Sequence, residues 1–320
     1  MEPYRAPWWL QGGHSQTILG GLLGPGQSVA YTRERWNTPD GDFVDVDWAG
    51  PENADRLLVM FHGLEDNSGS RVARAVARRA LAAGNWRYAM PHFRGCSGSP
   101  NLRPRAYHAG DSEEADWMLR RFAALHPAVH AVGVSLGGNV LLKWLGEQGD
   151  SAVNVVRRAV TVCAPFDVTA FGENIGRGFN NIYGWYFLYV AGLRRKALKK
   201  IQQFPAEFSA LGISASCVRA IKTLPEYDDV VTAPLHGFGN KFNYWRLASA
   251  VNVLSEIRVP TLILNARNDP FLPERVLPKA GELPRNLVLE FPSQGGHVGF
   301  PSRSQWLPRR ILDFLSVLSS

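Results

Sequence analysis

The sequence is poor in cysteine and has no long apolar run. Its three cysteines, Cys96, Cys163 and Cys217, are an odd number without metal-ligand spacing, which argues against a disulfide framework and against a metal centre. The longest apolar run, residues 183–193, is far shorter than the roughly 20 residues that span a membrane. The first five residues do not show a charged and then apolar signal-peptide pattern. We therefore expect a cytoplasmic protein without metal or cofactor.

Charge is present but is not patterned for nucleic acid. The net charge is +7 and the sequence pI is near 9.5, yet lysine and arginine are scattered and form no basic stripe interleaved with stacking aromatics. This excludes nucleic acid as the expected partner. The 45% hydrophobic content of 320 residues is enough for the core of one large α/β domain.

Short apolar runs alternate with helical patterns through most of the chain. This order predicts a mostly parallel sheet flanked by helices. A turn at residues 39–42 predicts an antiparallel hairpin at the start, whereas residues 7–17 show no clear period and are expected to wrap the core. The expected strands are 29–36, 43–48, 57–61, 88–90, 129–134, 158–163, 261–265 and 286–291, and the expected helices are 70–83, 111–125, 136–145 and 306–318.

The alternation stops between about residues 168 and 257. This stretch is helix-like, aromatic and interrupted by glycine and proline, and it is far longer than an ordinary connection in such a sheet. We interpret residues 1–167 and 258–320 as the α/β core. Residues 168–257 are then a lid insertion over the carboxyl edge of the sheet, where ligands of α/β folds bind.

One motif carries most of the chemistry. Residues 133–138, Gly-Val-Ser-Leu-Gly-Gly, fit the G-x-S-x-G nucleophile elbow, with a buried strand before Ser135 and an apolar-striped helix after it. Side chains at Gly133 and Gly137 would collide where strand and helix come close. We interpret Ser135 as a nucleophile and the backbone N–H of Leu136 as an oxyanion donor.

A serine nucleophile needs a base, and the base needs an orienting acid. In this architecture the order along the chain is serine, acid, histidine, each on a loop after a strand. Asp269 follows the strand 261–265, and His297 follows the strand 286–291 after two glycines. Other candidates for the acid are Asp167, Asp228 and Asp229.

The loop after the strand 57–61 is expected to complete the oxyanion site. Acyl transfer needs a second backbone donor beside the serine, and the N–H of Leu64 is placed to supply it. His62, two residues earlier, is interpreted as a residue that shapes this loop.

Together these motifs resemble the α/β-hydrolase superfamily, and within it the YheT-like esterases, which are related to abhydrolase-domain lipases and to plant embryogenesis-associated proteins. The resemblance rests on the segments 39–43, 62–65, 92–98, 133–139, 269–271 and 295–300, in the order of the family. It implies a charge relay of Ser135, Asp269 and His297. The chain departs from the pattern at Asp66, where the family leads us to expect glycine.

The function predicted from these residues is that of a serine ester hydrolase that forms an acyl-enzyme. The substrate is expected to be a small carboxylic ester, either short- to medium-chain or lipid-like, which places the enzyme in lipid metabolism. Two alternatives remain open, namely an acyltransferase that uses the same triad and a hydrolase-fold binding protein without catalysis.

The lid insertion has three possible roles in this prediction. Aromatic residues crowd residues 171–189, and Arg194, Arg195, Lys196, Lys199 and Lys200 follow. The aromatics, Trp185 and Phe187 among them, either line an acyl pocket or rest on an anionic lipid surface as a peripheral membrane contact. The third interpretation is that they only pack the lid onto the core.

Overall fold

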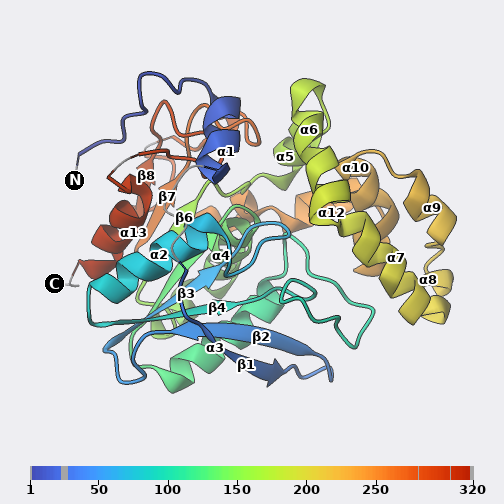
Figure 1. Cartoon of the computed structure of the whole chain (residues 1–320), viewed down its shortest axis with the longest axis horizontal. Helices are drawn as coiled ribbons and strands as arrows, with labels where there is room; N and C mark the ends of the chain where they lie inside the picture. The colour runs from blue at the N-terminus through green and yellow to red at the C-terminus, as the bar shows by residue number, and fades with distance from the viewer. Residues whose placement is uncertain (1, 23–27, 280, 303, 318–320) are drawn as a thin grey trace.

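An eight-stranded sheet forms the centre of the fold (Figure 1). The structure is a computed structural model that describes residues 2–22, 28–279, 281–302 and 304–317. The strand order is β1-β2-β4-β3-β5-β6-β7-β8, with β2 antiparallel to both of its neighbours and the pairs from β4 to β8 parallel. The strands are β1 (Thr32–Asn37), β2 (Phe43–Ala49), β3 (Arg56–Phe61), β4 (Trp86–Pro91), β5 (Val129–Val134), β6 (Arg158–Val162), β7 (Thr261–Leu264) and β8 (Leu287–Glu290).

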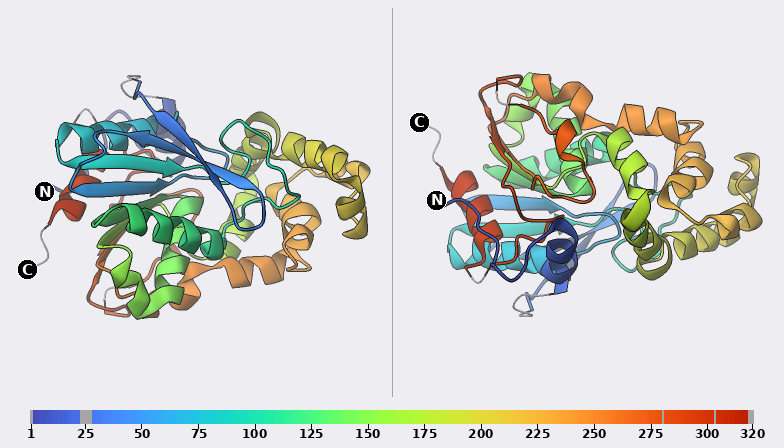
Figure 2. Two further views of the ribbon diagram at one scale, coloured as in Figure 1. Left: turned by 90° about the horizontal axis from the view of Figure 1, so that it is seen from below. Right: turned by 90° about the horizontal axis from the view of Figure 1, so that it is seen from above.

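Both faces of this sheet are buried. Alternate residues of β3 enter different clusters: Leu57 and Val59 join one core, whereas Leu58 and Met60 join the other. Figure 2 shows helices on both sides of the sheet. Helices α3 (Ser112–Leu125) and α4 (Leu136–Gln148) cover the first face, and α2 (Arg71–Ala82) and α13 (Trp306–Ser316) cover the second. The predicted α/β-hydrolase architecture, a mostly parallel sheet flanked by helices, is therefore confirmed.

Helix termini follow the sequence with small differences. The hydroxyl of Ser70 caps α2 by accepting the Ala73 N–H. Asp111 precedes α3 as predicted, but its carboxylate accepts from the Arg105 guanidinium at 2.5 Å and does not cap the helix. The predicted extension of α13 to Leu318 lies outside the described residues.

A group of helices extends from one end of the sheet (right in Figure 1). In the sequence these helices lie between β6 and β7. Its side chains form a third apolar cluster with Phe271 from the core. The elements are α5 (Val168–Ile175), η2 (Gly178–Asn180), α6 (Asn181–Trp185), η3 (Tyr186–Ala191), α7 (Leu193–Gln203), α8 (Pro205–Ala210), α9 (Ala215–Ala220), α10 (Leu224–Tyr227), η4 (Asp228–Thr232), α11 (Ala233–Leu235), α12 (Lys241–Ala248) and η5 (Ala250–Glu256). Two further short turns, η1 (Gly149–Asn154) and η6 (Glu274–Val276), belong to the remainder of the chain, as does the N-terminal helix α1 (Gly13–Leu22).

Candidate active site

Ser135 occupies the sharp turn between β5 and α4. Its backbone has φ 52° and ψ −123°, a conformation that costs energy for a residue with a side chain. The turn requires glycine on both sides, because a Cβ on Gly133 would lie 2.5 Å from the Gly137 carbonyl oxygen. A Cβ on Gly137 would lie 2.5 Å from the carbonyl oxygen of His62. The predicted reason for these two glycines is confirmed.

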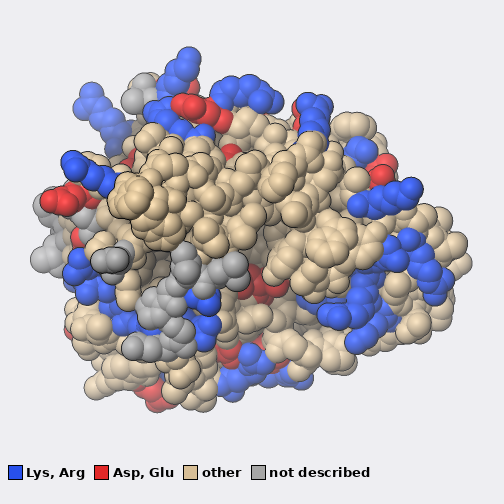
Figure 3. Space-filling model, turned by 45° about the horizontal axis from the view of Figure 1, so that its top comes forward, with Lys and Arg blue, Asp and Glu red and all other residues tan. Residues whose placement is uncertain are grey.

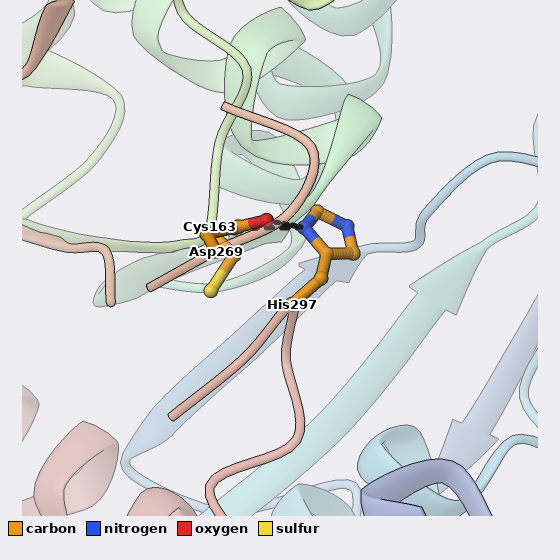
Figure 4. A group of neighbouring side chains, drawn as sticks. All are labelled: Cys163, Asp269 and His297. Atoms are coloured by element: carbon orange, nitrogen blue, oxygen red, sulfur yellow. Dashed lines mark hydrogen bonds and ion pairs between the residues drawn. The ribbon is translucent and has the colours of Figure 1, made fainter. Parts of the chain in front are cut away.

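The structure brings the three predicted site residues into one hydrogen-bonded chain. The Nε2 atom of His297 lies 2.8 Å from Ser135 Oγ, and its Nδ1 atom lies 2.9 Å from Asp269 Oδ2. Figure 4 shows the carboxylate of Asp269 facing the His297 ring. Asp269 is buried, and the Phe271 ring stacks on the imidazole with centroids 3.9 Å apart. This arrangement places an imidazole against the serine hydroxyl and a carboxylate against the imidazole, the order of groups in a serine–histidine–aspartate triad.

The other aspartates are engaged elsewhere. Asp167 caps α5 by accepting the Ala170 N–H, and Asp229 accepts the Lys241 N–H. The carboxylate of Asp228 accepts from the Trp245 indole and the Thr232 hydroxyl, and burial raises its pKa to about 6. Of the four candidate aspartates, Asp269 is the one whose carboxylate hydrogen-bonds to His297.

The N-terminal helix α1 supports the loop that carries His297. The sequence patterns did not predict this contact. Thr17 of α1 accepts the His297 N–H at 2.8 Å through its hydroxyl. The side chain of Gln16 is buried and accepts both the Gly295 N–H and the Asn268 amide through Oε1. Residues 7–17 are therefore more than a wrapping segment. A fully buried glutamine in a stretch without an apolar period leaves no signal that sequence patterns detect.

Cys163 lies beside Asp269 and His297 (Figure 4). Its Sγ accepts the Val298 N–H at 3.2 Å and donates to the Gly296 carbonyl at 3.6 Å, so it contacts the loop on both sides of His297. Burial raises the pKa of this thiol. Ligand atoms of Cys163, Asp269 and His297 lie within 4.8 Å of one another, as in a metal site. However, the hydrogen bonds between Asp269 and His297 already use the atoms that an ion would need.

The loop after β3 lies directly against the serine. A Cβ on Gly63 would be 3.3 Å from the Ser135 Cβ, and Leu64, Leu136 and Ser135 line one cavity. The next residue, Glu65, has a left-handed backbone with φ 56°. Asp66, where the family pattern leads us to expect glycine, is therefore not the residue of this loop that has a left-handed backbone.

Contacts of Glu65 hold this loop in place. Its N–H donates to the Tyr107 hydroxyl, and that hydroxyl donates back to Glu65 Oε1, both at 2.8 Å. Its Oε2 atom pairs with the Nζ of Lys196 at 2.5 Å, and the Glu65 side chain is only 1% exposed. The loop beside Ser135 is thus tied to Tyr107 and to helix α7.

His62 shapes the same loop, as predicted. It is fully buried, its Nδ1 donates to the Gly63 carbonyl at 2.7 Å, and its Nε2 accepts the Phe93 N–H at 3.0 Å. Burial, with His92 nearby, lowers the pKa of His62 to about 3.

We expect His62 to make the fold acid-sensitive. Its folded pKa lies below the unfolded value of about 6.5, so the unfolded state binds the extra proton. The free energy of unfolding should therefore fall as the pH drops below about 6.5, with up to about 1.4 kcal/mol per pH unit from this residue. The variant His62→Gln should show a shallower slope between pH 6 and pH 4 in urea unfolding. Between pH 7 and 8 the free energies of unfolding of the wild type and of His62→Gln should change in parallel. If they also change in parallel below pH 6, His62 is not the source of the acid sensitivity.

The cavity above Ser135 has a volume of about 720 Å³. Residues 168–257 supply many of its apolar lining side chains, including Phe171, Phe187, Phe208, Leu224 and Val231. Lys196 and Lys200 of α7 also line it, and Lys200 donates to the Arg105 carbonyl at 2.9 Å. Burial lowers the pKa of Lys200 to about 8. Trp185, predicted together with Phe187 as a pocket residue, instead points outward and is 53% exposed.

Fold and site together define the class of protein. Residues 56–303 match the family model described as alpha/beta hydrolase fold, and the chain belongs to this family. This confirms the resemblance drawn from the motifs. Within the described residues, none of the helices combines the length and the apolar character that crossing a bilayer requires.

Individual relatives agree with this membership. The chain is 37% identical over 315 residues to "Putative esterase YheT" of Escherichia coli, covering 95% of this chain and 90% of that protein. It is 25% identical over 333 residues to "Phospholipase ABHD3" of Bos taurus, covering 99% and 79% respectively. The solved esterase EaEST of Exiguobacterium antarcticum shares the fold, with a TM-score of 0.57 and 17% identity over 89% of this chain and 100% of that one.

Proposed function

We propose that this protein is a serine esterase that cleaves carboxylic esters through an acyl-enzyme. The observation that carries the proposal is the hydrogen-bonded chain from Asp269 through His297 to Ser135 at the floor of an apolar cavity. The name of the Escherichia coli relative agrees with this chemistry.

In this mechanism His297 Nε2 takes the proton of Ser135 as the Oγ atom attacks the ester carbonyl carbon. Asp269 accepts from Nδ1–H and stabilises the imidazolium that forms. The N–H groups of Leu64 and Leu136 donate to the oxyanion. The alcohol leaves with the proton from His297. Water then attacks the acyl-enzyme by the reverse sequence and releases the acid.

The cavity supports a preference for esters with an aliphatic acyl group. Its volume exceeds what acetate fills, and its lid-derived lining is rich in aromatic and aliphatic side chains. We therefore treat residues 168–257 as a lid and propose short- to medium-chain or lipid-like esters as substrates. The phospholipase name of a second relative is consistent with a lipid-like ester. Three free cysteines, one of them exposed, support a reducing location such as the cytoplasm.

An acyltransferase would use the same residues, with an alcohol in place of water in deacylation. Product analysis with and without an added alcohol separates the two functions. Formation of free acid in both conditions supports the esterase, whereas transfer to the alcohol in preference to water supports the transferase. A binding protein without catalysis is not favoured, because His297 lies within hydrogen-bond distance of both Ser135 and Asp269.

The acyl-chain preference provides a specific prediction for the lid. Phe187 lines the cavity, whereas Trp185, two residues earlier, does not. Phe187→Ala should lower kcat/KM for medium-chain p-nitrophenyl esters by about tenfold and leave the acetate ester nearly unchanged, because lost apolar contact affects only the longer chain. Trp185→Ala is the matched control and should keep the wild-type chain-length profile. Equal effects of the two variants would contradict an acyl pocket at Phe187.

A further inference from the structure

The helical stretch formed by η2, α6 and η3 is apolar on two opposite faces. Residues 178–193 contain no charged side chain. One face points inward, where Tyr183 and Leu188 are buried in the apolar cluster that includes Phe271. The Tyr183 and Phe271 rings form a T-shaped pair with centroids 4.8 Å apart. A helix that is apolar all round is normally buried all round.

The other face is open to solvent. Six large apolar side chains, each between 41% and 58% exposed, recur at helical spacing along it; we call this set the lid stripe: Phe179, Ile182, Trp185, Tyr186, Tyr189 and Val190. Figure 3 shows a broad uncharged surface on this side of the molecule, with lysine and arginine along its edges and a group of them at its right end. Contiguous exposed apolar side chains of this kind mark a contact surface.

Positive charge borders the lid stripe. From residue 174 to residue 206 the sequence has six lysines and arginines and no acid. Three of the cations, Arg177, Arg195 and Lys199, are exposed, and Arg177 lies 4.0 Å from the Glu173 carboxylate. The guanidinium of Arg194 lies 4.9 Å from the centre of the Tyr189 ring. The border therefore favours an anionic partner over a neutral or cationic one.

We propose that the lid stripe docks on an anionic lipid surface. Tryptophan and tyrosine suit the boundary between apolar lipid and water, because each has an apolar ring and a polar group. Apolar residues flanked by lysine and arginine bind anionic bilayers through burial of apolar surface and through attraction between the cations and the lipid headgroups. The proposal rests on the esterase function in one respect. Phe187 and α7 line the cavity, so docking would bring that cavity to a source of lipid esters.

Co-sedimentation of the full chain with vesicles tests the proposal. Vesicles of phosphatidylcholine with phosphatidylglycerol should pellet the wild type, whereas vesicles of phosphatidylcholine alone should pellet much less. High salt should weaken the binding. The double variant Ile182→Ser with Trp185→Ser should lower the partition coefficient by at least about tenfold, because two large apolar side chains no longer enter the lipid.

The matched control is Leu125→Ser, which removes a side chain that is 58% exposed at the end of α3, a core helix (Figure 1). This variant should bind vesicles like the wild type, and thermal melts should show that all three proteins are folded. Binding of the double variant at the wild-type level would overturn the proposal, and so would a wild type that ignores anionic vesicles. A dimer in sedimentation velocity that the double variant dissolves, without any vesicle binding, would assign the stripe to a second copy instead.

The outcome is independent of the esterase function. Ser135→Ala should bind vesicles like the wild type even if it hydrolyses nothing. Loss of hydrolysis with intact binding leaves docking in place. Hydrolysis of soluble esters without vesicle binding refutes docking and leaves the esterase in place.

Discussion

Ser135→Ala is expected to lower kcat for a soluble p-nitrophenyl ester by about 10⁶, as removal of the nucleophile does in other triad enzymes. Alanine has no Oγ to attack the carbonyl, and His297 is left without the proton it would accept. The fold should remain intact, because the strained turn is set by Gly133, Gly137 and the backbone hydrogen bond from Ser135 N–H to Val162.

A fluorophosphonate probe measures the same assignment directly. The wild type should be labelled at Ser135, and the alanine variant should not be labelled. Ser151→Ala, in the turn that follows the same helix, is the control and should keep both labelling and activity. Labelling that persists in Ser135→Ala would place the nucleophile elsewhere.

Asp269→Asn should lower kcat by roughly 10⁴. The asparagine NH₂ would donate to His297 Nδ1 and favour the tautomer with its proton on Nε2. That tautomer cannot accept the serine proton, although the ring stays in position. Phe271 stacks on the His297 ring, and the Thr17 hydroxyl accepts the His297 backbone N–H. The position of His297 should therefore be kept in this variant.

Asp167→Asn is the comparison, because Asp167 was the other acid that follows a neighbouring strand. Its carboxylate caps α5, so we expect a stability loss of at most about 1 kcal/mol and little change in kcat. Steady-state kinetics on both variants show which aspartate orients His297. A larger kcat loss in Asp167→Asn than in Asp269→Asn would move the acid to the loop after β6.

Much of the site could be predicted because its geometry is local. A serine between a buried strand and a helix, with glycine two residues before and after, specifies its own turn. Asp269 and His297 each follow a parallel strand, and parallel strands bring their carboxyl ends to one edge. The order of the strands therefore predicts the contact between Ser135 and His297, which are 162 residues apart in the sequence.

The rest depends on contacts that no local pattern records. Helix α1 contains three glycines, and Gly20 packs against the backbone of Gly299. A Cβ at Gly20 would lie 2.4 Å from that residue's Cα. Tertiary contact, rather than propensity, explains a helix there. The orientation of Trp185 and Phe187 was not predictable either. The stretch is apolar all round, and its π-helical turn over Tyr186–Ala191 shifts the helical register.

The ion pair of Glu65 with Lys196 has a consequence for the loop beside Ser135. Displacement of α7 would leave the Glu65 carboxylate, which is 1% exposed, without the Lys196 charge beside it, so the ion pair favours the position that α7 has in the structure. The same displacement would leave Glu65, whose left-handed backbone lies next to the proposed donor Leu64, with its contacts to Tyr107 and to the Cys96 thiol. The position of α7 and the geometry of the loop that carries Leu64 are therefore linked through the contacts of Glu65.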